Sequence, residues 1–167
     1  MNKFQTFCRT LDTTLGHLLS GLLVFLVVDV SWQVLTRFLL SQPSSVTEEL
    51  ARFLLIWIGL LGAVHAYRAR LHLGIDLFTR KLSQPVQENL HRLVHLACAL
   101  FAVAIFIIGG GNLMFMTWSL GQSSPSLGLP MAAVYSVLPL SGLLMCLYSA
   151  EAILLGASVE PTESPAE

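Results

Sequence analysis

The chain has 167 residues, of which 54% are hydrophobic and only 11% are charged, and its net charge is −1. A soluble domain has about 25% charged residues, so this composition excludes an ordinary soluble domain. The near-zero net charge gives no indication of a nucleic-acid partner. Long uncharged stretches predict an all-α integral membrane protein with four transmembrane helices, forming a single domain over residues 1–156.

The first two transmembrane helices are expected at about residues 11–40 and 47–67, separated by a loop that contains Pro43. Proline lacks a backbone N–H and cannot continue a helix interior, so it ends the first helix. Two acidic residues, Glu48 and Glu49, lie in the first turn of the second helix, where negative charge favours the helix dipole.

Residues 70–83, between the second and third spans, alternate apolar and polar side chains. This segment is too short and too polar to cross a bilayer. The pattern predicts a helix that lies in the plane of the interface, with its apolar side toward membrane lipid. The apolar members of this predicted interfacial helix are Leu73, Ile75, Leu77 and Phe78.

The third and fourth spans are expected at about residues 86–120 and 130–155. The three glycines at residues 109–111 are expected to interrupt the third span near its far end. Pro139 is expected to kink the fourth span. The acidic tail, residues 157–167, is rich in Glu, Ser and Pro, and this composition predicts disorder.

The distribution of basic residues predicts the orientation in the membrane. Short cytoplasmic connections are enriched in Lys and Arg. Seven of the nine basic residues fall on one side of the predicted spans, namely Lys3, Arg9, Arg68, Arg70, Arg80, Lys81 and Arg92. We therefore expect that side, with the N- and C-termini, to be cytoplasmic in a multi-pass protein of an inner, cytoplasmic-type membrane.

Three polar residues of the first helix, Asp29, Gln33 and Arg37, recur at intervals of four and so share one face. A charged side chain at the bilayer centre costs about 2.5–3.5 kcal/mol on insertion scales, so such residues need partners. The pattern favours a polar seam that faces another helix. The alternative is that Arg37 extends to the outer surface and that Asp29 is neutral.

In the second helix, Glu48 and Arg52 are four residues apart and are expected to pair. Glu49 then remains available for a different partner, for which Arg37 of the preceding helix is one candidate. We consider these residues as candidates for contacts between helices or between subunits.

Small residues follow Arg52 along the same face of the second helix, at Gly59, Gly62 and Ala63. Small side chains at this spacing let two helix backbones approach closely in a membrane. The pattern therefore predicts a packing face, either within the chain or against a partner. The alternative is that small residues occur there by chance.

Two histidines support a second interpretation of the chain. His95 lies in the third span, and His65 lies near the same predicted level of the membrane, so they could bind haem iron or a quinone in an anchor subunit of a respiratory enzyme. A third interpretation is a small exporter that works alone as a homo-oligomer. The sequence contains no recognisable catalytic triad or phosphate-binding loop, which argues against an enzyme.

Four segments in order carry a resemblance to a known family: residues 43–52 (PSSVTEELAR), 57–63 (WIGLLGA), 72–76 (HLGID) and 124–130 (SPSLGLP). Together they closely resemble the small membrane subunit, the Q or DctQ-like subunit, of tripartite ATP-independent periplasmic (TRAP) transporters. The resemblance covers about residues 10–156. Each segment alone would be a weak signal, whereas their order and spacing are specific.

The resemblance implies a role in sodium-coupled uptake of an organic anion, such as a carboxylate or a sialic acid. In that family a periplasmic binding protein captures the substrate. A large membrane subunit holds the substrate and sodium and moves like an elevator. The small subunit packs beside the large one, extends its fixed scaffold and helps to dock the binding protein. The resemblance thus implies no cofactor in this chain, and sodium in the large partner.

Overall fold

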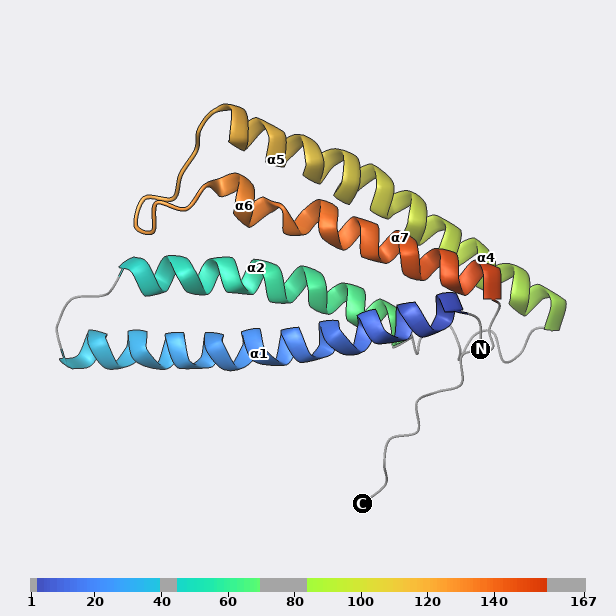
Figure 1. The fold of residues 1–167 in the computed structure, drawn as a ribbon, viewed down its shortest axis with the longest axis horizontal. Coiled ribbons are helices and arrows are strands. Elements are labelled where there is room, and N and C mark those ends of the chain that lie inside the picture. The colour runs from blue at the N-terminus through green and yellow to red at the C-terminus, as the bar shows by residue number, and fades with distance from the viewer. Residues whose placement is uncertain (1–2, 40–44, 70–83, 156–167) are drawn as a thin grey trace, which may run out of the picture.

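The computed structural model describes residues 3–39, 45–69 and 84–155, and almost all of them are helical (Figure 1). Within these ranges the one β-type contact is an isolated antiparallel bridge between Ser123 and Pro130. The elements are α1 (Lys3–Leu39), α2 (Ser45–Arg68), α4 (Gln84–Phe101), the π-helical segment η1 (Ala102–Gly109), α5 (Gly110–Ser119), α6 (Met131–Tyr135) and α7 (Val137–Leu155).

Four helical stretches are long and apolar enough to cross a membrane, as the sequence predicted. They are α1, α2, the continuous α4–η1–α5 rod and the α6–α7 pair. The all-α fold with four candidate spans is thereby confirmed. The predicted interfacial helix, with Leu73, Ile75, Leu77 and Phe78, and the predicted tail lie outside the described residues, as does Pro43.

Helix α1 begins at Lys3, well before the predicted start near residue 11. Its 37 residues span about 55 Å at 1.5 Å per residue, whereas a bilayer core is about 30 Å thick. The early turns are stabilised by packing, because Cys8 is buried and Phe4 contacts the same core cluster. Polarity alone suggested a later start, since these turns also carry exposed Thr6 and Thr10.

The helices form two antiparallel hairpins, α1 with α2 and the third span with the fourth (Figure 1). Helix α2 packs on α7, so the two hairpins meet along these helices. We call the end where α1 begins and α7 ends the terminal end, and the opposite end the loop end. The core between the hairpins includes Leu15 of α1, Leu61 and Val64 of α2, and Tyr148 of α7.

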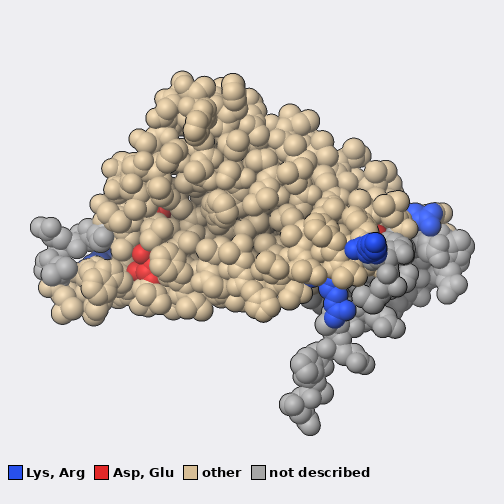
Figure 2. Space-filling model, viewed as in Figure 1, with Lys and Arg blue, Asp and Glu red and all other residues tan. Residues whose placement is uncertain are grey.

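Most of the outward surface is apolar. Large hydrophobic side chains such as Val24 and Phe25 of α1 and Ile105 and Ile108 of the third span are exposed. Figure 2 shows that, on the face it draws, charged side chains lie at the two ends and the middle is uncharged. An apolar belt between two charged ends matches the cross-section of a bilayer.

The third and fourth spans approach most closely at two glycines. A Cβ atom at Gly110 would lie 2.6 Å from Cβ of Leu138, and one at Gly142 would lie 2.8 Å from Cβ of Phe106. Real Cβ atoms do not approach so closely, so both positions require glycine. The glycine tract does not interrupt the third span, which is helical through residues 109–111.

The fourth span is interrupted at Ser136, between α6 and α7. Pro139 explains this position, because it has no N–H to donate to the carbonyl oxygen of Tyr135, four residues earlier. The sequence predicted a kink at Pro139, and the observed interruption of the helix lies one turn before this proline.

Candidate functional site

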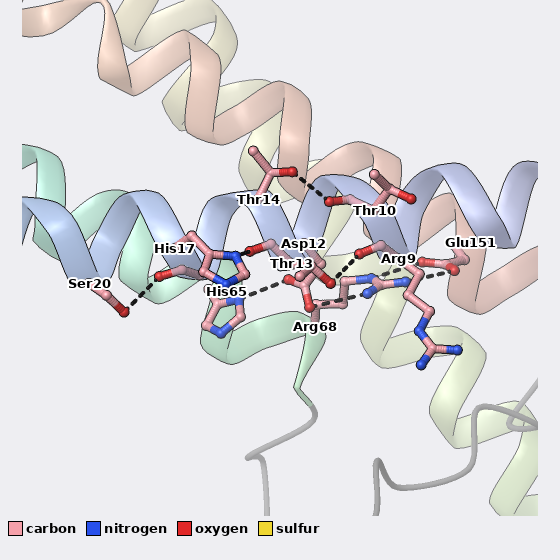
Figure 3. A network of polar contacts seen from close by, with 11 residues as sticks. Arg9, Thr10, Asp12, Thr13, Thr14, His17, Ser20, His65, Arg68 and Glu151 are labelled. Carbon is pink, nitrogen blue, oxygen red and sulfur yellow. Dashed lines mark hydrogen bonds and ion pairs between the residues drawn. The ribbon is translucent and has the colours of Figure 1, made fainter.

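At the terminal end, three helices are joined by ion pairs around Arg68, at the end of α2 (Figure 3). The guanidinium donates two hydrogen bonds to the carboxylate of Glu151 on α7, at 3.1 and 3.2 Å. Its Nη1 atom lies 3.2 Å from Oδ2 of Asp12 on α1. The side chains of Arg68 and Glu151 are only 17% and 6% exposed, so this arrangement is largely shielded from solvent.

Two further contacts complete this terminal cluster. Nδ1 of His65 lies 2.9 Å from Oδ1 of Asp12, and the guanidinium of Arg68 lies 5.1 Å from the ring centroid of Tyr148. The imidazole of His65 also lies against α1 at Gly16, where an added Cβ would be 3.5 Å from Cε1, an ordinary contact distance. The cluster therefore fixes α1, α2 and α7 relative to one another.

The two histidines of the haem interpretation contact different side chains. His65 contacts Asp12, and Nδ1 of His95 lies 2.6 Å from the hydroxyl of Tyr67. The same hydroxyl is 2.8 Å from Oγ of Ser149 on α7. These contacts tie α2 to the third and fourth spans beneath the terminal cluster.

At the loop end, Glu49 holds the connection between the third and fourth spans. Its Oε2 atom accepts hydrogen bonds from the backbone N–H groups of Ser126 and Leu127, both at 2.9 Å. Arg37, the candidate partner from the sequence, is exposed, and Glu49 is instead directed toward the loop. Two segments of the resemblance, residues 43–52 and 124–130, are therefore in direct contact.

The loop itself is tightly hydrogen-bonded. Ser124 donates its N–H to the carbonyl oxygen of Leu129 at 2.8 Å, and its Oγ atom accepts the N–H of Leu129 at 3.2 Å. Gly128 has a φ of 65° and Gly121 a φ of 59°, a conformation that favours glycine. The loop is thus an ordered, uncharged turn anchored by one carboxylate.

The predicted pair between Glu48 and Arg52 is present in the first turns of α2. Both side chains are open, with exposed fractions of 48% and 69%. The pair therefore lies on the outer surface of the chain, and no helix among the described ranges covers it.

The polar residues of α1 divide between two environments. Asp29 is buried, at 7% exposure, and its Oδ2 atom has no hydrogen-bond partner within the described ranges. Thr36 on the same side is also buried, Gln33 is partly buried and Arg37 is exposed. Asp29 and Gln33 thus lie along the face that α1 turns toward α2, whereas Arg37 points outward.

Among the residues that the structure describes, no helix packs closely against the small residues of α2. A Cβ built at Gly59 or Gly62 would meet no atom within 4 Å, and Ala63 is exposed. Sequence reasoning instead missed Gly110 and Gly142, which do form close helix contacts. The small-residue rule applies equally to internal and external packing, so it did not distinguish them.

The terminal cluster was also missed, although one signal was present. Glu151 is the lone charged residue within the fourth apolar span, and a charge there needs a partner. Asp12 and Arg68 lie at the ends of their own apolar stretches. Charged residues are common there, at the membrane interface, so neither one indicated a buried partner.

Comparison with known proteins gives consistent matches. Residues 26–158 match the family described as Tripartite ATP-independent periplasmic transporters, DctQ component. The chain is 32% identical over 122 residues to the sialic acid TRAP transporter small permease protein SiaQ of Vibrio cholerae, with 70% of each chain covered. It is 33% identical over 99 residues to the C4-dicarboxylate TRAP transporter small permease protein DctQ of Rhodobacter capsulatus, covering 59% of this chain and 43% of the relative.

A further relative is much longer. The isethionate TRAP transporter permease protein DctMQ of Oleidesulfovibrio alaskensis is 31% identical over 131 residues, which cover 74% of this chain but only 20% of the relative. In that protein the region similar to this chain is therefore joined to a far larger remainder.

Proposed function

The chain belongs to the DctQ component family of tripartite ATP-independent periplasmic transporters, and from this premise we propose that it supports a large permease subunit and helps to dock a soluble binding protein. The family is a transporter component and not an enzyme, which excludes the anchor subunit of a respiratory enzyme. The chain is accordingly a multi-pass protein of the bacterial inner membrane.

The large permease is the first partner. The fused DctMQ relative supports this pairing, because it carries the small-permease region and a longer remainder in one polypeptide. Where the two subunits are separate polypeptides, the small subunit recognises the large permease only through contacts between their surfaces. The outer face of α2 is the best candidate for that surface.

Two features of α2 favour this face over a lipid contact. A Cβ at Gly59 or Gly62 would meet no atom of the described residues within 4 Å and Ala63 is exposed, and small residues allow a partner helix to approach closely. The exposed pair of Glu48 and Arg52 continues the same face toward the loop end. A partner subunit that covers this end of α2 can pair its own polar groups with these two side chains.

The loop held by Glu49 is the candidate docking element for the binding protein. The predicted orientation, with basic connections inside, puts residues 121–130 on the periplasmic side. The hydrogen bonds to Ser126 and Leu127 limit the motion of this loop, and a fixed loop loses less entropy on binding than a flexible one.

The transported substrate is an organic anion of the carboxylate or sialic acid class, taken up with sodium. The relatives named above act on sialic acid, C4-dicarboxylate and isethionate, which share a negative charge at neutral pH. We assign the substrate and sodium sites to the large partner. This chain then contributes structure and docking.

The observation that carries the proposal is the outer face of α2, with Gly59, Gly62 and Ala63, and co-purification tests it. The tagged chain is co-expressed with the large permease subunit of its transporter and extracted in mild detergent. Gly59→Leu should lower the yield of large partner, because the added side chain separates the packed surfaces. Gly21→Leu is the matched control, since Gly21 on α1 is also exposed and contacts nothing within 4 Å. Equal recovery from both variants would refute the α2 contact.

A further inference from the structure

The third span contains a change of helix type at its centre. In η1 the hydrogen bonds reach one residue further than in an α-helix, as the N–H of Gly110 donates to the carbonyl oxygen of Ile105, five residues earlier. A π segment therefore holds an extra residue relative to the α-helix that would replace it. Such segments are rare in helices and frequent at functional positions.

The extra residue changes which side chains face α7. Before η1, the half-buried or buried positions include His95, Cys98 and Ala102, spaced as on one face of an α-helix. An uninterrupted α-helix would next bury positions 105, 109, 113 and 116. In the structure these four residues, Ile105, Gly109, Leu113 and Met116, are exposed. The residues one place later, Phe106, Gly110, Met114 and Thr117, are buried or half-buried, as are Ile107 and Gly111 beside them.

The glycine tract is compatible with the observed π form of residues 102–109 and also with an α-helical form of the same residues. Gly110 is required now, because a Cβ there would be 2.6 Å from Cβ of Leu138. Gly109 is not required now, since its Cβ would lie 3.6 Å from the carbonyl oxygen of Ala104, an ordinary contact. If residues 102–109 became α-helical, Gly109 would take the place against Leu138. A glycine would again fill the position that only glycine fits.

The opposite surface is also permissive. Gly142 of α7 lies against η1. A Cβ atom at this position would overlap Phe106 and Ile107, so these two side chains fill the space that a larger residue would need. A glycine here presents a flat backbone past which the side chains of η1 can rotate. The contact to α7 can therefore be kept in both arrangements.

We propose that η1 is a register switch, in which residues 102–109 alternate between the π form and an α form. The change turns α5 relative to α4 by about 100° and shifts it by about 1.5 Å, the step of one residue in an α-helix. Helix α5 leads directly into the loop held by Glu49, so the switch connects the middle of the membrane to the loop end. This inference does not depend on the proposed function.

Cysteine cross-linking in membranes tests the two registers, in a chain whose native cysteines are replaced by serine. Phe106 lies opposite Gly142 and Gly110 opposite Leu138, so the same antiparallel spacing pairs Met114 with Val134. Val134→Cys is combined with Met114→Cys to report the π register, and with Leu113→Cys to report the α register. Phe115→Cys, at an exposed position outside both facing sets, gives the background.

We expect copper-phenanthroline to cross-link the Met114 pair strongly and the Leu113 pair above the Phe115 background. Gly109→Ala should lower the Leu113 cross-link roughly tenfold, since a clash of about 1.4 kcal/mol already changes a population by that factor. It should leave the Met114 cross-link intact, which also shows that the variant is folded. Gly111→Ala is the matched control and should change neither, because its Cβ would meet nothing within 4 Å.

Deletion of Ile105 gives an independent test, because it removes the extra residue without changing the glycines. The deleted chain should keep the Met114 cross-link and lose the Leu113 cross-link. Three results would each overturn the switch: a Leu113 cross-link no stronger than background in the parent chain, an equal effect of Gly109→Ala and Gly111→Ala, or loss of the Met114 cross-link on deletion.

Discussion

The carboxylate of Glu49 lies 2.9 Å from the backbone nitrogen of Ser126, 77 residues later in the chain. This contact joins the first turn of α2 to the loop between the third and fourth spans. A carboxylate that accepts two adjacent N–H groups holds a turn more firmly than a neutral acceptor does. The loop geometry therefore depends on a residue of another hairpin.

Glu49→Ala should loosen the loop and lower the stability of the chain by about 1.5–3 kcal/mol, the usual range for hydrogen bonds to a charged group. Hydrogen–deuterium exchange at residues 124–130 should become faster, and thermal unfolding in detergent should occur earlier. Glu48→Ala is the control, because an exposed pair contributes about 0.5 kcal/mol or less. Unchanged exchange in Glu49→Ala would mean that the loop is ordered by its own hydrogen bonds.

Arg68→Met should destabilise the chain strongly, because it leaves the shielded carboxylates of Glu151 and Asp12 without their cation. Breaking a buried ion pair from one side costs about 3–5 kcal/mol. The double change Arg68→Met with Glu151→Leu should recover much of this loss. Thermal unfolding of the three proteins measures the effect, and Arg92→Met at an exposed site should be neutral. A double variant no better than the single one would contradict the pairing.

Gly142→Ala and Gly62→Ala should have opposite effects on the isolated chain. At Gly142 the added methyl group overlaps Phe106 and Ile107, and overpacking costs about 1–3 kcal/mol. At Gly62 the space is open, and alanine is a better helix former than glycine by up to about 1 kcal/mol. The melting temperature should fall for the first variant and rise for the second. Two shifts of the same sign would be inconsistent with these packing environments.

The predicted orientation can be checked by labelling single cysteines in cells. Ser123→Cys, in the exposed part of the loop, should react with a membrane-impermeant maleimide added from outside. Arg9→Cys, exposed near the start of α1, should react only after the inner membrane is permeabilised. Both reactions require a chain without its native cysteines. The reverse pattern would place the termini outside and contradict the expectation from basic residues.

The four spans could be predicted because hydrophobicity over about 20 residues is a local property of the sequence. The pair of Glu48 and Arg52 could be predicted for the same reason, since four residues bring two side chains together on any helix. The start of α1 could not, because its first turns are fixed by contacts of Cys8 and Phe4 with other helices.

The contacts that build the site depend on how helices pack, and spacing along one helix does not reveal them. Glu49 was recognised as available for a distant partner, but its partner is a backbone segment that no side-chain rule points to. Three consecutive glycines gave no indication that Gly110 is the one in contact. Gly110 is the glycine in contact because η1 adds one residue before it. The residues of η1 are uniformly apolar, so the sequence has no pattern that distinguishes a π form from an α form.

One guanidinium serves two acids from different helices, and this has a consequence for how the sequence can change over generations. Loss of Arg68 first leaves two shielded carboxylates unpaired, and loss of both acids first leaves the guanidinium unpaired, so the early steps are deleterious, whereas the replacement of the last remaining charge is nearly neutral. The order of substitution therefore matters at these positions, and they should be inherited as a set. Related lineages are expected to keep all three charges or to have replaced them together.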